Sequence, residues 1–172
     1  MTDRQRLLAR IKGDPELVER LLMVADLPED NQAVLRPEDA VVHFAPLLAG
    51  YSEERLAVLA LNRRHVVKDK VVLTKGTDCF TIVDPRQILR WALTSGRHAP
   101  SGIILAHNHP SGDPTPSQQD IKVTRQVEDA CKVVGISLLD HLVVCGPTVW
   151  KSMAELGYVY PGIGRKNVVW TG

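Results

Sequence analysis

The sequence lacks the features that mark membrane, secreted and strongly nucleic-acid-binding proteins. Among its 172 residues, no apolar run approaches the ~20 residues that span a bilayer, so we expect no contact with a membrane. Its first 16 residues hold no continuous apolar stretch, and a secretory signal is therefore not expected. The net charge of +1 provides no strong attraction to nucleic acid or to an anionic lipid surface.

Cysteine is too scarce and too scattered to support a disulfide framework. The three residues, Cys79, Cys131 and Cys145, are an odd number and form no closely spaced pair. We therefore expect reduced, mostly buried thiols, which are typical of a cytoplasmic protein.

The sequence does contain an alternation of helical and strand-like segments. Its length suits one domain with a short appended arm, and a hydrophobic content of 44% is enough for a sizeable core. Apolar periodicity and start or stop residues predict helices over residues 14–27, 37–48, onward from Asp84-Pro85, 117–135 and 151–157. In the helix over 117–135 the expected buried stripe is Ile121, Thr124, Val127, Cys131 and Val134.

Strands are predicted between these helices. They cover residues 54–62, 65–76, 79–83, 101–107 and 136–146, and the first and fourth have uninterrupted apolar centres that suggest burial on both faces. Alternating strands and helices favour an α/β layered domain with a mixed sheet.

Two histidines stand at the end of the clearest buried strand. His107 and His109 are two residues apart, so in an extended chain their side chains point the same way. Asp120 lies in the first turn of the next helix, and three prolines between residues 110 and 116 stiffen the loop that returns to it. Two imidazoles and a carboxylate with one open position form the ligand set of a hydrolytic zinc site.

Each part of this pattern also has an ordinary structural explanation. A single histidine near a strand end is usually structural. Ser117 and Asp120 have the spacing of a helix capping box, and for Ser117 alone capping is the commoner role. The whole spacing (His-x-His, seven residues, Ser, two residues, Asp) is far more specific than any part, and it favours the metal site.

The combined motif resembles the signature of the JAMM, or MPN-plus, metalloproteases. The segment HNHPSGDPTPS resembles their RadC-like bacterial branch, and ERLAVLALN and GISLLDHLVV also resemble RadC-family blocks. The resemblance covers roughly residues 36–157 and implies a cytidine-deaminase-like JAB/MPN fold, an α/β layered fold with a mixed central sheet flanked by helices. It leaves residues 1–35 as a short helical arm and residues 158–172 as a tail.

The resemblance also implies the chemistry. One Zn²⁺ per chain would be held by His107, His109 and Asp120, and the substrate would be a peptide or protein cleaved at a peptide or isopeptide bond. A nucleoside deaminase of the related fold is not expected, because the His-x-Glu and Cys-x-x-Cys patterns are absent.

Such a reaction needs a proton acceptor, which JAMM enzymes take from an early strand. Glu53 and Glu54 stand at that place, and Glu54 shares a strand face with Leu56 and Val58. We predict Glu54 as the general base, although most adjacent glutamates at a strand start are merely solvated. The resemblance gives Ser117 the role of hydrogen-bonding the oxyanion, a role that competes with helix capping for one hydroxyl group.

Several polar residues have no clear task. Asp140 and His141 match a recurring RadC-like pair. Two interpretations of this pair remain: it contacts the metal ligands or the substrate, or it is an ordinary polar pair within a strand. His43, His65 and His98 are isolated, and we expect them at the surface or in structural positions.

The sequence therefore predicts a zinc metallopeptidase of the JAMM type. Two alternatives remain. One is a DNA-associated role, which the RadC name suggests and the basic segment 63–70 supports weakly. The other is a non-catalytic, partner-binding MPN-like module. Loss of the metal ligands would indicate such a module, and this sequence retains all of them. Neither the substrate nor the oligomeric state follows from the sequence.

Overall fold

The computed structural model describes residues 32–73, 84–96 and 99–160. The elements in these ranges, in chain order, are α3 (Pro37–Leu48), β1 (Leu56–Leu61), β2 (Val67–Leu73), α4 (Pro85–Thr94), β3 (Gly102–Asn108), α5 (Gln118–Val134), β4 (Ser137–Val144) and β5 (Trp150–Ser152). The strands form one sheet in the order β2-β1-β3-β4-β5. β3 and β4 are parallel and the other neighbours are antiparallel, so the sheet is mixed as predicted.

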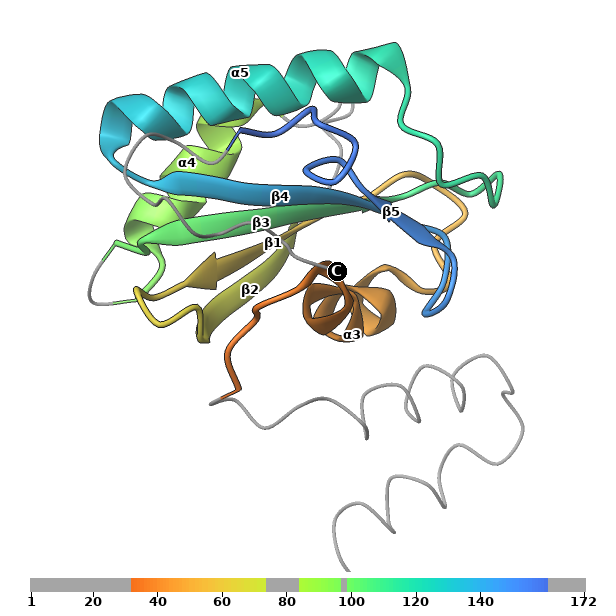
Figure 1. Ribbon diagram of the computed structural model, residues 1–172, viewed down its shortest axis with the longest axis horizontal. Coiled ribbons are helices and arrows are strands. Elements are labelled where there is room, and N and C mark those ends of the chain that lie inside the picture. Colours follow the sequence, from red (N-terminus) through yellow and green to blue (C-terminus); the bar gives the residue numbers. More distant parts are fainter. Residues whose placement is uncertain (1–31, 74–83, 97–98, 161–172) are drawn as a thin grey trace, which may run out of the picture.

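The sheet is covered on both faces. α4 and α5 lie on one side of it and α3 on the other (Figure 1). Every residue of β1 and β3 is buried, which confirms that their apolar runs form central strands. Alternate residues serve the two layers: Leu56 and Val58 join the core under α4 and α5, whereas Ala57 and Leu59 join the core over α3.

The helices begin and end where local chemistry predicts. α3 and α4 each have a proline in the first turn, and the Asp84 carboxylate accepts a hydrogen bond from the Arg86 N–H at 2.9 Å. Ser117 caps α5, and Gly135 ends it with φ of 73°, a conformation that favours glycine.

Two details of the helix predictions are wrong. Val134 is 39% exposed, because the chain leaves the helix at Gly135 and Ile136 takes the buried position beyond the cap. Residues 151–157 do not form a helix: the chain adds β5 to the sheet edge and then turns. The missing helix is explained by a contact between residues distant in the sequence. The Ser152 hydroxyl donates a hydrogen bond to the buried Asp140 carboxylate, which fixes this part of the chain beside β4.

The isolated histidines are not surface residues where the structure describes them. His43 and His65 are both buried, with 4% and 9% of their surface exposed, so only the structural alternative holds for them. His98, the helix expected over 14–27 and the strand expected over 79–83 lie outside the described residues. None of the described helices combines the length and the apolar character that crossing a membrane requires.

Candidate metal centre

The three predicted ligands meet at the carboxyl end of β3. His107 is the penultimate residue of that strand, pairs with Leu56 of β1 and Val143 of β4, and is 2% exposed. His109 follows two residues later, and Asp120, 1% exposed, lies in the first turn of α5. The sheet therefore positions the histidines, and the helix that covers it supplies the carboxylate.

The ligand atoms of these residues converge on one point. The Nε2 atoms of His107 and His109 are 3.0 Å apart. Asp120 places Oδ1 3.3 Å from His107 Nε2 and Oδ2 3.5 Å from His109 Nε2. One ligand atom of each residue can be chosen so that all lie within 4.8 Å of one another.

Backbone and hydroxyl groups orient two of the ligands from behind. His109 Nδ1 lies 2.8 Å from the carbonyl oxygen of Asp113, which can only accept, so Nδ1 carries a proton; a ring with that single proton presents a bare Nε2. The Asp120 Oδ2 atom accepts hydrogen bonds from the N–H and the hydroxyl group of Ser117, at 2.7 and 2.6 Å. Asp120 Oδ1 accepts neither of these bonds and lies 3.3 Å from His107 Nε2.

The electrostatic state of Asp120 suits a cation. Burial raises the pKa of this carboxyl group, but its contact with His107 and the two hydrogen bonds from Ser117 hold the pKa well below its usual range. The group is therefore ionised at neutral pH although it is almost fully buried.

This arrangement fits Zn²⁺. Tetrahedral zinc with bonds of about 2.0–2.1 Å requires ligand atoms about 3.3 Å apart. The two histidine Nε2 atoms are 3.0 Å apart, and each lies 3.3 or 3.5 Å from its nearer oxygen of Asp120, close to that value. Three ligands of this type leave a fourth position for water or substrate, as hydrolytic zinc sites require.

A second layer of polar side chains lies behind His107. His107 Nδ1 is 2.9 Å from His141 Nε2, and His141 Nδ1 is 2.6 Å from the hydroxyl oxygen of Thr124. Both partners are fully buried. Burial lowers the pKa of His141 well below its ordinary value.

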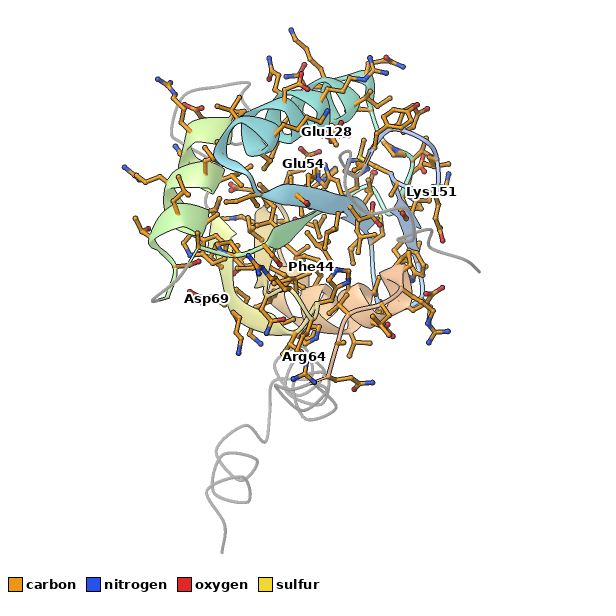
Figure 2. The ribbon with its side chains drawn as sticks, turned by 60° about the vertical axis from the view of Figure 1, so that its left-hand side comes forward. Phe44, Glu54, Arg64, Asp69, Glu128 and Lys151 are labelled. Atoms are coloured by element: carbon orange, nitrogen blue, oxygen red, sulfur yellow. The ribbon has the colours of Figure 1, made fainter. Side chains whose placement is uncertain are left out.

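Glu54 lies in the segment that leads into β1. Leu56, two residues on, pairs with His107 and packs in the core beneath α4 and α5. Continuing the antiparallel register by two residues brings Glu54 opposite His109. Figure 2 shows Glu54 between the sheet and α5, on the other side of the sheet from Phe44.

The neighbouring glutamate points elsewhere. The Glu53 side chain is 71% exposed and forms an ion pair with Arg55 at 3.5 Å, whereas Glu54 is half-buried. This difference agrees with the predicted alternation, although the base role of Glu54 stays a prediction.

Asn108, between the two histidines, holds the Glu54 segment in place. Its Oδ1 accepts from the Arg55 N–H at 2.7 Å, and its Nδ2 donates to the carbonyl oxygens of Glu53 at 3.0 Å and Tyr51 at 3.3 Å. Because neighbouring residues of a strand point to opposite faces, this side chain is directed away from the ligand face. From the sequence no role was assigned to Asn108, although its place inside the His-x-His pattern was an available signal.

Ser117 acts as a helix cap in this structure. Its hydroxyl oxygen accepts the Asp120 N–H at 3.1 Å while its proton goes to Asp120 Oδ2. Ser117 is exposed, and the predicted oxyanion contact requires its hydroxyl proton to turn away from Asp120. That role is untested and stays a prediction.

The sequence model of the RadC-like JAB domain family matches residues 34–158, which include every residue of the candidate metal centre. The chain belongs to the RadC-like JAB family. Its mixed sheet with helices on both faces is the layered fold expected of a JAB/MPN domain. The boundaries predicted for the N-terminal arm and the C-terminal tail stay predictions.

Relatives that share the designation UPF0758 with one another match most of this chain. A UPF0758 protein of Coprothermobacter proteolyticus is 37% identical over 141 residues, covering 79% of this chain and 57% of the relative. Another, from Symbiobacterium thermophilum, is 44% identical over 119 residues, covering 69% and 49%. A third, from Listeria monocytogenes, is 38% identical over 151 residues, covering 87% and 64%. The chain thus spans about half to two thirds of the length of these relatives.

In this RadC-like JAB domain, Asp140 joins neighbouring segments and does not face the metal centre. Its carboxylate accepts from the Ser152 hydroxyl at 2.6 Å and from the backbone N–H groups of His141 and Ala154 at 2.6 and 2.9 Å. Burial raises the pKa of Asp140 to about 6, and these three hydrogen bonds oppose the rise. The Asp-His pair therefore divides its tasks: Asp140 holds the β4–β5 region, and His141 contacts His107.

A pocket of about 370 Å³ opens beside the metal centre of the RadC-like JAB domain. It lies among residues 48–51 at the end of α3, residues 108–110 at the end of β3 and residues 144–147 at the end of β4. His109 is part of its wall, and no Asp, Glu, Lys or Arg occurs among the described residues that line it. The pocket can thus receive an uncharged group next to the ligands.

Proposed function

We propose that the chain is a zinc-dependent hydrolase that cleaves a peptide or isopeptide bond. The observation that carries the proposal is the buried meeting of His107, His109 and Asp120, whose ligand atoms have separations suited to one tetrahedral ion. Membership of the RadC-like JAB family supports it. The chain spans only part of its relatives, so the proposal concerns this domain and not a longer protein.

Zn²⁺, when bound, would polarise the substrate carbonyl and lower the pKa of a water molecule. The protein must then manage the protons. We assign to Glu54 the acceptance of a proton as the water oxygen bonds to the carbonyl carbon, and its delivery to the nitrogen as the C–N bond breaks. The products are a carboxylic acid and an amine, and Glu54 returns to its ionised form. The half-buried position of Glu54 opposite His109 supports this role.

Ser117 would assist at the developing oxyanion. Its hydroxyl lies within hydrogen-bond distance of Asp120, so it is adjacent to the metal ligands. A rotation of this hydroxyl proton toward substrate would keep the Oγ atom as acceptor for the Asp120 N–H and so preserve the helix cap.

The pocket beside His109 supports a substrate with an uncharged residue next to the cleaved bond. Its walls combine apolar side chains such as Leu48 and Val144 with the ring of Tyr51. A charged side chain would lose its hydration there without gaining an opposite charge from the described lining residues.

Metal analysis followed by a peptide screen tests the proposal. Protein purified without a histidine tag is expected to contain about one zinc per chain, and Asp120→Asn is expected to bind zinc at least about 10-fold more weakly because the neutral amide lacks the negative charge of the carboxylate ligand. Asp113→Asn is the matched control, since Asp113 contacts His109 through its backbone carbonyl. A wild-type protein that stays metal-free in added zinc would overturn the site.

Hydrolysis is tested separately from metal binding. The zinc-loaded protein is expected to cleave members of a library of peptides and isopeptides with uncharged residues beside the scissile bond. If zinc binds stoichiometrically and no amide is cleaved, the enzymatic proposal fails while the metal site stands, and a partner-binding role becomes the better account.

A further inference from the structure

The buried side chains behind His107 form a directed chain of hydrogen bonds. It runs from the backbone carbonyl of Asp120 through Thr124 and His141 to His107, with successive distances of 2.6, 2.6 and 2.9 Å. It thus connects two metal ligands through two residues that are not ligands. All of these side chains are buried, so water does not compete for these contacts.

The carbonyl end of the chain decides the direction of every bond. The Asp120 carbonyl oxygen can only accept, so at 2.6 Å the Thr124 hydroxyl must donate to it. The nearby Met153 sulfur, at 3.6 Å from the same hydroxyl, is a weaker acceptor. With its one proton used, the Thr124 oxygen must accept from His141 Nδ1. A His141 ring that carries its single proton on Nδ1 has a bare Nε2, which must accept from His107 Nδ1.

This direction leaves His107 Nε2 without a proton. The bare nitrogen faces Asp120 Oδ1 and the bare Nε2 of His109, so the lone pairs converge where a cation would lie. The opposite tautomer of His141 would carry its proton on Nε2 and donate it to His107. His107 would then carry a proton on its own Nε2, directed at His109, and could not bind a metal.

We propose that Thr124 and His141 are positioning residues that hold His107 in its metal-binding tautomer before any metal arrives. The inference uses the metal site of the proposed function but not its hydrolytic step. It assigns Thr124 the deciding part, because its hydroxyl selects between the two tautomers of the His141 ring. His141 transmits that choice across 2.9 Å to the ligand.

Thr124→Val tests this role, because valine has nearly the same shape and cannot accept a hydrogen bond from His141. Zinc affinity, measured by competition with a chromophoric chelator, is expected to fall about 10–100-fold, the usual cost of losing a residue that orients a metal ligand. Thr124→Ser retains the hydroxyl and is expected to restore most of the affinity. If Thr124→Val does not fold, Thr124→Ala removes the same hydroxyl and has the same expectation.

The tautomer itself is measured in metal-free protein. Long-range proton–nitrogen NMR correlations at pH about 8, above the ordinary histidine pKa of ~6.5, report which ring nitrogen of His107 carries the proton. The wild type is expected to show Nδ1–H, and Thr124→Val a shift toward Nε2–H. This spectrum is independent of hydrolysis, so it separates failure of the relay from failure of the enzymatic proposal.

Ser152→Ala is the matched control. It removes another buried hydroxyl, one that donates to Asp140 and does not touch His141. Its zinc affinity and its His107 spectrum are expected to match the wild type. A wild-type His107 protonated on Nε2 would overturn the inference. An unchanged affinity and tautomer in Thr124→Val, or an equal loss of affinity in Ser152→Ala, would do the same.

Discussion

At the scale of single residues, neighbouring side chains of the same type have different environments. Glu53 is a solvated residue with an ion-pair partner, and Glu54 lies on the side of the sheet that α5 covers. Asp120 and Asp140 are both about 1% exposed, yet the first is held ionised among donors and the second has its pKa raised to about 6. Surroundings, and not residue type, therefore decide which carboxylate can serve the metal centre.

Glu54→Gln tests the proposed base directly. Glutamine has nearly the same shape but cannot accept the proton, so hydrolysis is expected to fall about 10²–10⁴-fold while zinc content stays at the wild-type level. Turnover of the best library peptide and metal analysis are measured on the same preparations.

Glu53→Gln serves as the control for that experiment, because its exposed side chain is expected to contribute little to turnover. If Glu53→Gln is inactive and Glu54→Gln is active, the base has been assigned to the wrong neighbour. If both variants stay active, no glutamate of this segment activates the water.

At the scale of elements, the end of β3 organises both faces of the sheet. His107 faces the α5 layer, and Asn108 holds residues 51–55 on the other side of the strand. One strand thus carries a ligand and also fixes the segment that bears the proposed base. β4 works in a similar way, since His141 contacts the ligand and Asp140 holds the chain after β5.

Asn108→Ala is expected to separate these two tasks of β3. It removes the three hydrogen bonds that position Glu54 and leaves the ligands in place, so turnover should fall about 10²-fold through misplacement of the base. Zinc affinity should stay close to the wild-type value. Parallel measurement of both quantities decides the matter, and an equal loss of the two would mean that Asn108 supports the ligands as well.

Asp140 gives an expectation for the pH dependence of stability. Its pKa of about 6 in the folded protein exceeds the reference value of 3.8, so the fold favours the protonated form. The stability contributed by that proton is fully present below the reference value and is lost as pH rises through about 6. The loss reaches up to about 3 kcal/mol for a shift of this size.

Asp140→Asn should remove this dependence, because the amide does not titrate. Urea unfolding of metal-free wild type and variant is compared at several pH values from about 4 to 7. The free energy of unfolding of the variant, relative to the wild type, is expected to increase across that range. A difference that stays constant with pH would show that folding does not raise the pKa of Asp140.

At the scale of the whole molecule, the metal centre and the adjacent pocket lie on different sides of the end of β3. The ligands gather under α5, and the pocket opens toward the end of α3. His109 belongs to both, so a substrate in the pocket would present its backbone to the ligands. A second pocket of about 320 Å³, lined mainly by apolar residues of α3 together with Pro147 and Trp150, has no metal ligand in its wall.

Filling the first pocket should therefore affect substrate binding. Ala49→Trp places a large ring in it, and KM is expected to rise about 10-fold or more for peptides with a large uncharged residue beside the scissile bond. Val42→Trp is the control, because Val42 is 41% exposed and lines only the second pocket of the two. Steady-state kinetics compare two peptides that differ only in having a large or a small residue beside the scissile bond. If the pocket takes no part in binding, Ala49→Trp would change KM equally for both peptides.

The sequence by itself determined the features that depend on neighbouring residues. The apolar runs of β1 and β3 specify central strands, and the spacing of His107 and His109 directs both rings to one side. Ser117 and Gly135 specify where α5 begins and ends. These features follow from alternation, helical period and capping, which act within a few residues.

Only the tertiary structure decided the features that depend on distant residues. Thr124 and His141 are 17 positions apart, His107 and His141 are 34 apart, and Asn108 reaches Tyr51 across 57. Thr124 was expected only in a buried stripe. Residues 151–157 were expected as a helix, but in the structure this segment completes β5 and then turns, and the Ser152 hydroxyl bonds to Asp140. Hydrogen bonds between buried polar groups depend on which strands become neighbours, and local periodicity carries no information about that.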